Sequence, residues 1–485
     1  MRLIARVCVA TLLSLAPAWA MAQPTDYASL SDADKAMLDE LEHRTFDFFH
    51  VSANAANGQV PDHWPQDKGD YFSSIASVGF GLTAYGIGAE RGWITREEAA
   101  QRTLATLRFF HDAPQGDAPD ASGDHGFFYH FLDMKTGRRY GARRWVELST
   151  IDTTLLLGGV LFAESYYDGQ GADEKEIRRL SDEIYRRVDW RWASPRPPLV
   201  AMGWTPEAKF IRADWQGYNE AMLLYVLALG SPTHAVEPAA WKTWTQTYDA
   251  TWGSFQGQEY LGFAPLFGHQ YSHVWIDFRG IQDDYMREHG SDYFINSRRA
   301  TIAQREYAIH NPMHWTDYGS TLWGLTACNG PRAKTPPGEP DRYASDPKTF
   351  YGYVARGAGL HGTIDDGTIA PTAAASSIAF APEIVVPAIA AMKHRYGTAV
   401  YTPYGFIDAF NPSFTFTDRP LRTGRIDPKV GWVDTLYLGI DQGPIVAMIE
   451  NYRSDFVWKV MRRNPYIRAG LQRAGFRGGW LDETK

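Results

Sequence analysis

Apolar residues recur at intervals of three and four positions along most of the chain, which is the spacing of one face of an α-helix. Residues 31–49 place Leu41 and Phe48 on the same face, and Thr95 with Glu98 forms a capping box at the start of a further helix. Clear runs with the two-residue period of a strand are almost absent, although short hairpins could lie in the loops. More helices are predicted at residues 73–90, 150–167, 174–190, 218–229, 238–251, 297–310, 381–396 and 444–462.

This pattern predicts an all-α fold. About a dozen helices joined by long loops, with no obvious linker between them, favour a closed toroid of six helical hairpins over separate bundles. In such a toroid an inner and an outer ring of helices bury each other, and the loops at one end form a substrate cleft. We expect a single domain over residues 23–485, in which the Pro/Gly/Asp-rich stretch 329–346 is a loop excursion.

The first 22 residues have the pattern of an export signal. Arg2 and Arg6 are their only charges, an apolar stretch follows, and Ala20 and Ala22 supply small residues at a cleavage site. We therefore expect export, with the periplasm as the destination and the extracellular medium as the alternative. The apolar stretch is too short to span a membrane, so no membrane association is expected. Cys328 would be the one cysteine left after cleavage, which excludes an intrachain disulfide.

Charge and aromatic content narrow the class of ligand. The formal net charge is −8 and no block of Lys and Arg stands out, which argues against nucleic acid and anionic lipid as partners. The chain has 17 Trp, 26 Tyr and 25 Phe, and many of them fall in polar segments rich in Gly and Pro. Aromatic faces beside carboxylates suit an uncharged, hydroxyl-rich ligand such as a sugar, although each ring could equally belong to the core.

Two segments carry carboxylates next to an apolar helix. In the first, Trp145 and Glu147 precede the helix and are candidate substrate-contacting or catalytic residues, while Asp152 in its first turn could instead only stabilise the helix dipole. In the second, Glu220 follows Tyr218 and Asn219 and opens an otherwise apolar helix. Burial would raise the pKa of Glu220, as a general acid requires, but the residue could also simply stabilise the first turn.

Two further segments carry candidate ligand-binding groups. The stretch 267–280 repeats polar groups at a spacing of four, which could indicate a metal site, but sugar recognition is the better interpretation and we expect no metal. Its candidate substrate-binding residues are His269, Gln270, His273, Trp275, Asp277 and Arg279. Near the C-terminus, Asp408 lies among apolar neighbours, where an acid is costly unless it is paired or used. Phe406 and Asn411 beside it are candidate substrate contacts, whereas Asp441 fits a helix cap.

Taken together, these segments resemble the glucoamylase-like family of secreted bacterial proteins, whose characterised members are endo-β-1,2-glucanases of glycoside hydrolase family 144 and relatives. The resemblance runs from about residue 46 to about residue 458. Its motifs are SIASVGFGLTA at 74–84, IDT at 151–153, YNEA at 218–221, HQYSH at 269–273, DFR at 277–279, WGLTA at 323–327, GFIDAFN at 405–411 and GIDQGP at 439–444.

The resemblance implies an (α/α)6 toroid that hydrolyses linear or cyclic β-1,2-glucan with inversion, without a cofactor, and we expect a monomer. It implies that Glu220 is the proton donor. For the base, Asp408 is favoured and Glu147 and Asp152 remain alternatives. The chain departs from the family pattern at Asn329, where an acidic residue is expected.

Two other functions remain open at this point. A glucan-binding protein that has lost catalysis would bind without releasing reducing ends. An exo-acting β-glucosidase or a transglycosylase of the same fold would differ in its products.

Overall fold

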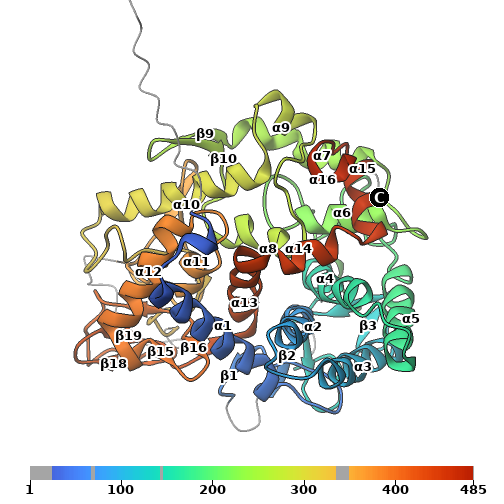
Figure 1. The fold of residues 1–485 in the computed structure, drawn as a ribbon, viewed down its shortest axis with the longest axis horizontal. Coiled ribbons are helices and arrows are strands. Elements are labelled where there is room, and N and C mark those ends of the chain that lie inside the picture. Colours follow the sequence, from blue (N-terminus) through green and yellow to red (C-terminus); the bar gives the residue numbers. More distant parts are fainter. Residues whose placement is uncertain (1–24, 67–70, 142–145, 335–348, 484–485) are drawn as a thin grey trace, which may run out of the picture.

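The structure is a computed structural model that describes residues 25–66, 71–141, 146–334 and 349–483. The predicted export signal and Trp145 lie outside these residues. The described helices form two concentric rings, an (α/α)6 toroid (Figure 1), as predicted. The inner ring consists of α2 (Ile75–Glu90), α4 (Thr150–Tyr166), α6 (Met222–Gly230), α8 (Phe267–Trp275), α11 (Pro371–Ala375) and α13 (Gly439–Ser454). The outer ring consists of α1 (Asp32–Ser52), α3 (Arg96–Asp112), α5 (Ala172–Arg186), α7 (Ala239–Trp244), α10 (Tyr293–His310) and α12 (Pro382–Tyr396).

Hydrophobicity separates the two rings. Every residue of α6 is buried, as are most residues of α2 and α4, because an inner helix has neighbours on all sides. An outer helix such as α5 buries one stripe, which contains Ile177, Leu180 and Ile184, and exposes charged residues on its other side. The toroid therefore has one continuous core between the two rings.

Glycine sets the distance between α2 and α4. A Cβ atom on Gly79 would lie 2.1 Å from the carbonyl oxygen of Leu155, and one on Gly159 would lie 2.0 Å from the carbonyl oxygen of Gly79. No larger residue fits at either position without separating the helices. These two helices can pack this closely only because the sequence places glycine at the contact.

The remaining described elements are short and lie outside the two rings of helices. They include the helices α9 (Asp284–Glu288), α14 (Phe456–Met461), α15 (Pro465–Arg473) and α16 (Gly479–Asp482) and the 3-10 turns η1 (Tyr27–Ser29), η2 (Thr245–Ala250) and η3 (Gly397–Ala399). Strands of two to four residues form small antiparallel sheets, which were too short to show a period of two in the sequence. The strands are β1 (His63–Trp64), β2 (Phe72–Ser74), β3 (Gly123–Asp124), β4 (Phe127–Tyr129), β5 (Phe131–Asp133), β6 (Leu148–Ser149), β7 (Gly203–Thr205), β8 (Lys209–Phe210), β9 (Trp252–Phe255), β10 (Gln258–Leu261), β11 (Ala327–Cys328), β12 (Val354–Ala355), β13 (Gly357–Gly359), β14 (Gly362–Ile364), β15 (Tyr401–Thr402), β16 (Gly405–Phe406), β17 (Phe410–Asn411), β18 (Arg425–Asp427), β19 (Gly431–Val433) and β20 (Tyr437–Leu438).

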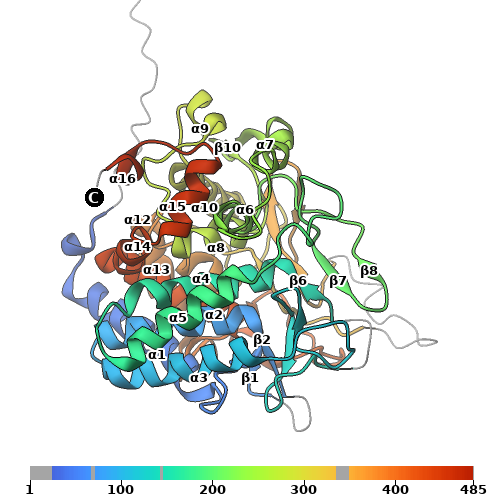
Figure 2. The same cartoon turned by 90° about the vertical axis from the view of Figure 1, so that its right-hand side faces the viewer.

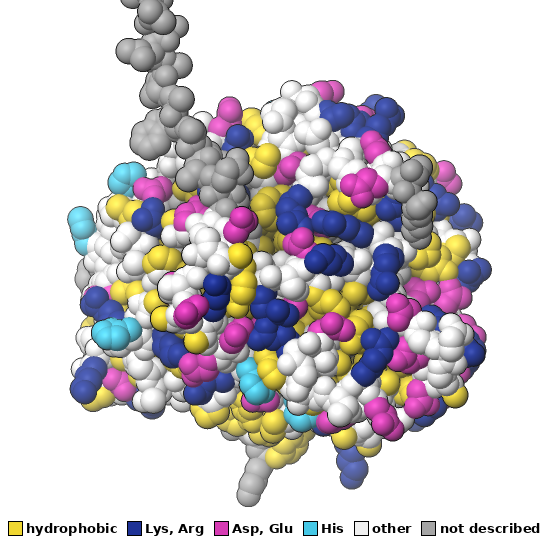
Figure 3. All heavy atoms as spheres, viewed as in Figure 1, with side chains coloured by type: hydrophobic (Ala, Val, Ile, Leu, Met, Phe, Trp, Pro, Cys, Tyr) yellow, Lys and Arg dark blue, Asp and Glu magenta, His cyan; other side chains and the backbone are white. Residues whose placement is uncertain are grey.

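The toroid has two different ends. At one end, which we call the strand end, β2, β6 and β20 run directly into the N-termini of α2, α4 and α13 (Figure 2). At the other, which we call the helix end, α14 contacts α8 and α13 close to where these inner helices finish (Figure 1). Figure 3 views the helix end, where Lys and Arg side chains lie beside Asp and Glu side chains. Among the described residues, no helix is both long and apolar enough to cross a membrane.

Candidate active site

The strand end carries a cavity of about 600 Å³. It opens where the N-termini of α2 and α13 meet the short strands β1, β2 and β20, so the partial positive charge of these helix ends faces into it. Such a field favours carboxylates. The lining residues are Asp62, His63, Pro65, Phe72, Ser74, His130, Phe131, Asn329, Tyr353, Arg422, Thr423, Gly424, Thr435, Leu436, Leu438 and Ile440.

A histidine between two carboxylates stands at this cavity. Nδ1 of His130 lies 3.0 Å from Oε1 of Glu147, and Nε2 lies 3.5 Å from Oδ2 of Asp152. The Ser149 hydroxyl, at the N-cap of α4, donates a hydrogen bond of 2.5 Å to the same Asp152 oxygen. Burial opposes protonation of His130, but Asp152 and Glu147 outweigh it and raise the pKa of His130 to about 9. Near neutral pH His130 is therefore an imidazolium between the two carboxyl groups, and we call the three residues the His130 triad.

The same three side chains are close enough to offer one ligand atom each to a metal ion. A metal ion binds neutral imidazole, whereas a pKa of about 9 keeps His130 protonated at neutral pH. A metal ion would therefore have to displace the proton of His130 in order to bind here.

Glu220 lies just before α6 and is partly buried. Its backbone is fixed from two directions, because the Ser272 hydroxyl of α8 donates to the Glu220 carbonyl at 3.0 Å and the Asn219 side chain accepts from the Ala221 amide at 2.9 Å. Burial raises the pKa of Glu220 to about 7, and the charge of Asp152 contributes in the same direction. Glu220 and the triad thus belong to one electrostatically connected group, in which the Glu220 carboxyl holds its proton up to neutral pH.

A second group of carboxyls lies behind Asn329. The Asn329 amide N–H donates to Oδ2 of Asp408 at 2.8 Å, and its side-chain amide donates to Asp434 at 3.0 Å. Asp408 is 1% exposed. Burial raises its pKa well above the ordinary range, and Asp441 and Asp434 raise it further. Burial also raises the pKa of Asp441 to about 7.

Asn329 has a defined place in this group. The sequence marked it as a departure from the expected acidic residue, and the structure places it on the cavity wall between Asp408 and Asp434. The backbone N–H that donates to Asp408 would also be present with an acidic residue, but the side-chain amide of Asn329 donates to Asp434, where a further carboxylate would add a like charge.

Most of the predicted sugar-binding side chains of α8 are in the core. His269, Gln270, His273 and Trp275 are each at most 1% exposed and have internal partners. His269 contacts the Tyr218 hydroxyl, and Gln270 donates to the Ala373 carbonyl of α11. Burial lowers the pKa of both histidines to about 3, so they are neutral packing groups. The helical spacing was real, but it describes contacts between inner helices rather than a ligand-binding face.

Asp277 and Arg279 follow α8 at the helix end, away from the cavity. Asp277 accepts two hydrogen bonds from Arg279, at 2.8 and 2.9 Å, and also pairs with Arg462. Phe406 and Asn411 are likewise buried, and Asn411 donates to the Asp366 carbonyl at 2.8 Å. These four residues were predicted to bind substrate, and the structure assigns each of them a structural contact instead.

Sequence reasoning missed three residues at the cavity, namely Asp62, His130 and Tyr353. Asp62 is partly exposed and directly precedes β1, and its charge acts on His130, Asp152 and Asp441. A signal was present, since Asp62 and His130 are polar residues at the ends of short aromatic segments. Without the strand pairing, nothing in the sequence links these segments to Glu220.

Two rings of helices, and a cavity at the N-termini of the inner ring with a histidine between two carboxyl groups, define the chain as an (α/α)6 toroid with a polar site at one end. The chain belongs to the Glycoamylase family, described as "Putative glucoamylase", whose family model matches residues 212–465. The family resemblance seen in the sequence is thereby confirmed.

Similar proteins cover almost all of the chain. The exo β-1,2-glucooligosaccharide sophorohydrolase (non-reducing end) of Parabacteroides distasonis is 28% identical over 468 residues, which are 91% of this chain but 58% of that protein. The chain thus spans less than two thirds of this curated relative. The endo-β-1,2-glucanase structure from Chitinophaga pinensis has 27% identity and a TM-score of 0.77 and covers 93% of this chain and 100% of its own. A structure from Bacteroides uniformis, described as a putative glucoamylase, has 29% identity and a TM-score of 0.78. The match covers 93% of this chain and 99% of the Bacteroides chain.

Proposed function

We propose that the protein is a glycoside hydrolase that cleaves β-1,2-glucan at the strand-end cavity. One observation carries the proposal, namely that His130 lines this cavity between Glu147 and Asp152, and that the charge of the same Asp152 acts on Glu220, whose pKa burial raises to about 7. Two groups whose environments separate their pKa values are what acid–base hydrolysis needs at neutral pH. The substrate class is supported by the two relatives above, which act on β-1,2-linked glucans.

In the proposed reaction Glu220 is the general acid. Its carboxyl gives a proton to the glycosidic oxygen as the C–O bond breaks, and a water molecule attacks the anomeric carbon from the opposite face. A carboxylate of the triad takes the proton of that water, directly or through a sugar hydroxyl. The two carboxyl groups then exchange protons with solvent and return to their starting states.

For the base we propose Glu147 or Asp152 in place of Asp408, which the sequence favoured. A base must be ionised, and burial together with Asp441 and Asp434 raises the pKa of Asp408 well above its ordinary range, which disfavours the ionised form. Burial raises the pKa of Asp152, and the imidazolium of His130 only partly offsets this effect. Glu147 is the more exposed of the two and contacts Nδ1 of His130 directly, which supports it as the group nearer to water.

We propose internal, endo-type cleavage with inversion, and release of disaccharides from a chain end is the second candidate. The endo-glucanase from Chitinophaga is covered over its full length, which supports the first. The Parabacteroides sophorohydrolase supports the second, but about two fifths of its length lies outside the match. We further propose that residues 1–22 direct export to the periplasm and that the enzyme works as a monomer without a cofactor. Cell fractionation and light scattering test location and oligomeric state.

The decisive experiment is digestion of linear and cyclic β-1,2-glucan. An endo enzyme opens the cyclic glucan and yields a ladder of oligosaccharides, whereas an exo enzyme needs a free end and leaves the ring intact. Proton NMR of fresh product should show the α-anomer first if the reaction inverts. Glu220→Gln should lower kcat about 10³-fold while substrate binding is retained.

Two controls complete this test. Glucans with β-1,3, β-1,4 and β-1,6 linkages check the linkage, and cleavage of one of them instead of the β-1,2 linkage would contradict the substrate. Binding of β-1,2-glucan by the wild type without release of reducing ends would make the protein a glucan-binding protein. Transfer products longer than the substrate would indicate a transglycosylase.

A further inference from the structure

Part of the cavity wall is built from two segments that contain none of the proposed catalytic carboxyls. Tyr353, just before β12, lines the cavity with its side chain 51% exposed. Arg422, before β18, lines it as well and is exposed. We call Tyr353 and Arg422 the cleft-wall pair. A large exposed aromatic residue in a hollow is unusual for a packing role and points to a ligand.

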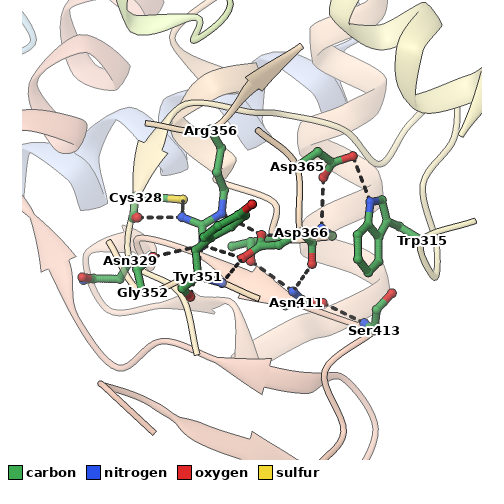
Figure 4. Close-up of polar contacts among 12 residues, drawn as sticks. Trp315, Cys328, Asn329, Tyr351, Gly352, Arg356, Asp365, Asp366, Asn411 and Ser413 are labelled. Carbon is green, nitrogen blue, oxygen red and sulfur yellow. Dashed lines mark hydrogen bonds and ion pairs between the residues drawn. The ribbon is translucent and has the colours of Figure 1, made fainter. Parts of the chain in front are cut away.

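A buried ion pair fixes the segment that carries Tyr353. Arg356 and Asp366 are both fully buried, and the guanidinium donates to both carboxylate oxygens at 2.7 and 2.8 Å (Figure 4). The same guanidinium donates to the carbonyl oxygens of Cys328 at 2.8 Å and Gly352 at 3.1 Å. Gly352 directly precedes Tyr353. The bidentate pair therefore grips the peptide next to Tyr353 and presents its ring in one position.

Through its hydrogen bond to the Cys328 carbonyl, Arg356 also fixes the peptide that leads to Asn329, another residue of the cavity wall. The peptide unit that follows Cys328 carries the N–H of Asn329, which donates to Asp408. Asp366 is itself held, because it accepts from the Tyr351 amide at 2.9 Å. One buried arginine thus fixes two adjacent stretches of the cavity wall, and a wall held in this way loses little conformational entropy when a ligand binds.

Tyr353 also lies close to the acidic groups of the cavity. Its hydroxyl interacts electrostatically with Asp441, Asp408 and Asp62. A sugar ring on the Tyr353 face would therefore lie within the acidic part of the cleft rather than on a remote surface.

Arg422 packs against the same segment. A Cβ atom on Gly352 would lie 3.3 Å from its Cδ and 3.5 Å from its Nη1. Among the residues that the structure describes, its guanidinium has no ion pair and no hydrogen-bond acceptor. Most other arginines near the cavity end are paired, for example Arg425 with Asp427 at 2.9 Å. The five N–H donors of Arg422 are therefore available to a ligand in the cavity.

We propose that the cleft-wall pair is a sugar-binding site that orients the glucan chain. The ring of Tyr353 stacks on the C–H face of one glucose unit, and the guanidinium of Arg422 donates hydrogen bonds to its hydroxyl groups. The pair contributes to binding of the glucan chain. This inference rests on the proposed function.

The test measures binding rather than turnover, in the Glu220→Gln background, by calorimetric titration with a linear β-1,2-glucan oligosaccharide. Tyr353→Ala should weaken binding about tenfold or more, whereas Tyr353→Phe should stay within about threefold because it keeps the ring. Arg422→Ala should weaken binding about fivefold. Arg425→Ala, an exposed and paired arginine three residues away, is the matched control and should have no effect.

The outcomes separate this inference from the proposed function. If Glu220→Gln binds the oligosaccharide and Tyr353→Ala and Arg422→Ala bind it equally well, the cleft-wall pair is not a binding site, while the proposed function stands. If Glu220→Gln binds no β-1,2-glucan and the wild type cuts none, the proposed function itself fails. A loss of affinity in Tyr353→Phe as large as in Tyr353→Ala would overturn the stacking contact.

Discussion

Asp277 at the helix end and Asp408 at the strand end are both only 1% exposed, yet their pKa values are shifted in opposite directions. Burial alone would raise the pKa of either carboxyl. At Asp277 the guanidinium groups of Arg279 and Arg462 more than offset it, and the pKa lies below the ordinary value. At Asp408 the neighbours are the carboxyls of Asp441 and Asp434, so the pKa lies well above it. At equal burial, the charge of the neighbours decides whether the rise in pKa caused by burial is offset, as at Asp277, or reinforced, as at Asp408.

Asp277 at the helix end and Asp408 at the strand end therefore differ in the charge of their neighbours, and we infer that they differ in role. At the helix end Arg279 and Arg462 neutralise Asp277, which ties the end of α8 to the end of α14 and stabilises the fold. The strand end gathers acids with few cations, and His130 is the main cation among them. Such an arrangement costs stability, as expected where acids are kept ready to donate or accept protons.

The largest effect should come from breaking the ion pair at the helix end. Asp277→Asn leaves Arg279 and Arg462 without their shared carboxylate and should lower the free energy of unfolding by about 3–5 kcal/mol at pH 7. Because the folded pKa of Asp277 is lowered, its contribution is present at pH 7 and is lost as the pH falls through the folded pKa. Urea denaturation measures the change.

The control for this prediction is a pair of the same chemistry on the surface. Asp120 pairs with Arg138, and both side chains are about half-exposed or more. Asp120→Asn should cost less than about 1 kcal/mol. Equal losses in the two variants would mean that the Asp277 network is no more than a surface pair.

At the strand end, replacing an acid by its amide should stabilise the protein rather than destabilise it. Burial disfavours the ionised form of Glu220 in the folded state, so the wild type loses stability as the pH rises from about 4.5 to its folded pKa of about 7. Glu220→Gln removes this loss. The variant should be more stable than the wild type by about 2 kcal/mol at pH 8, allowing for partial exposure, and equally stable at pH 4. Urea denaturation at both pH values tests it, and a variant that is less stable than the wild type at pH 8 contradicts a raised pKa of Glu220 in the folded state.

The sequence was sufficient to predict the toroid and, at the strand end, the raised pKa of Glu220. Helical periodicity is local, so the rings followed from it, and burial at the start of an apolar helix correctly placed Glu220 in a setting that raises its pKa. The surroundings of His130 and Asp408 could not be predicted, because they depend on contacts between distant segments. His130 meets Glu147 only through the pairing of β4 with β6, and Asp408 meets Asp441 across more than thirty residues. For the same reason, the spacing of His269, His273 and Asp277 suggested a ligand face where the structure has core and ion pairs.

A smaller effect should follow from removing the cation of the triad. His130→Gln leaves Glu147 and Asp152 close together without a positive charge, so one of them should take up a proton at neutral pH. We expect kcat on β-1,2-glucan to fall about tenfold and the acidic limb of the pH–rate profile to move to higher pH. His125→Gln is the control, because His125 pairs with Asp124 at 2.9 Å and does not line the cavity. An unchanged acidic limb would exclude the triad as the source of the base.

The smallest effect should come from Asp408→Asn. If the Asp408 carboxyl is already protonated, an amide of the same shape replaces one neutral group by another, and its oxygen can still accept from the Asn329 amide. Stability at pH 7 should change by less than about 1 kcal/mol, and kcat should stay within about threefold of the wild type. A base at this position predicts the opposite, a loss of about 10²–10⁴-fold in kcat at unchanged stability. Comparing kcat and urea denaturation for this one variant therefore decides whether the buried acid at the strand end is a proton acceptor or, like its counterpart at the helix end, a structural group.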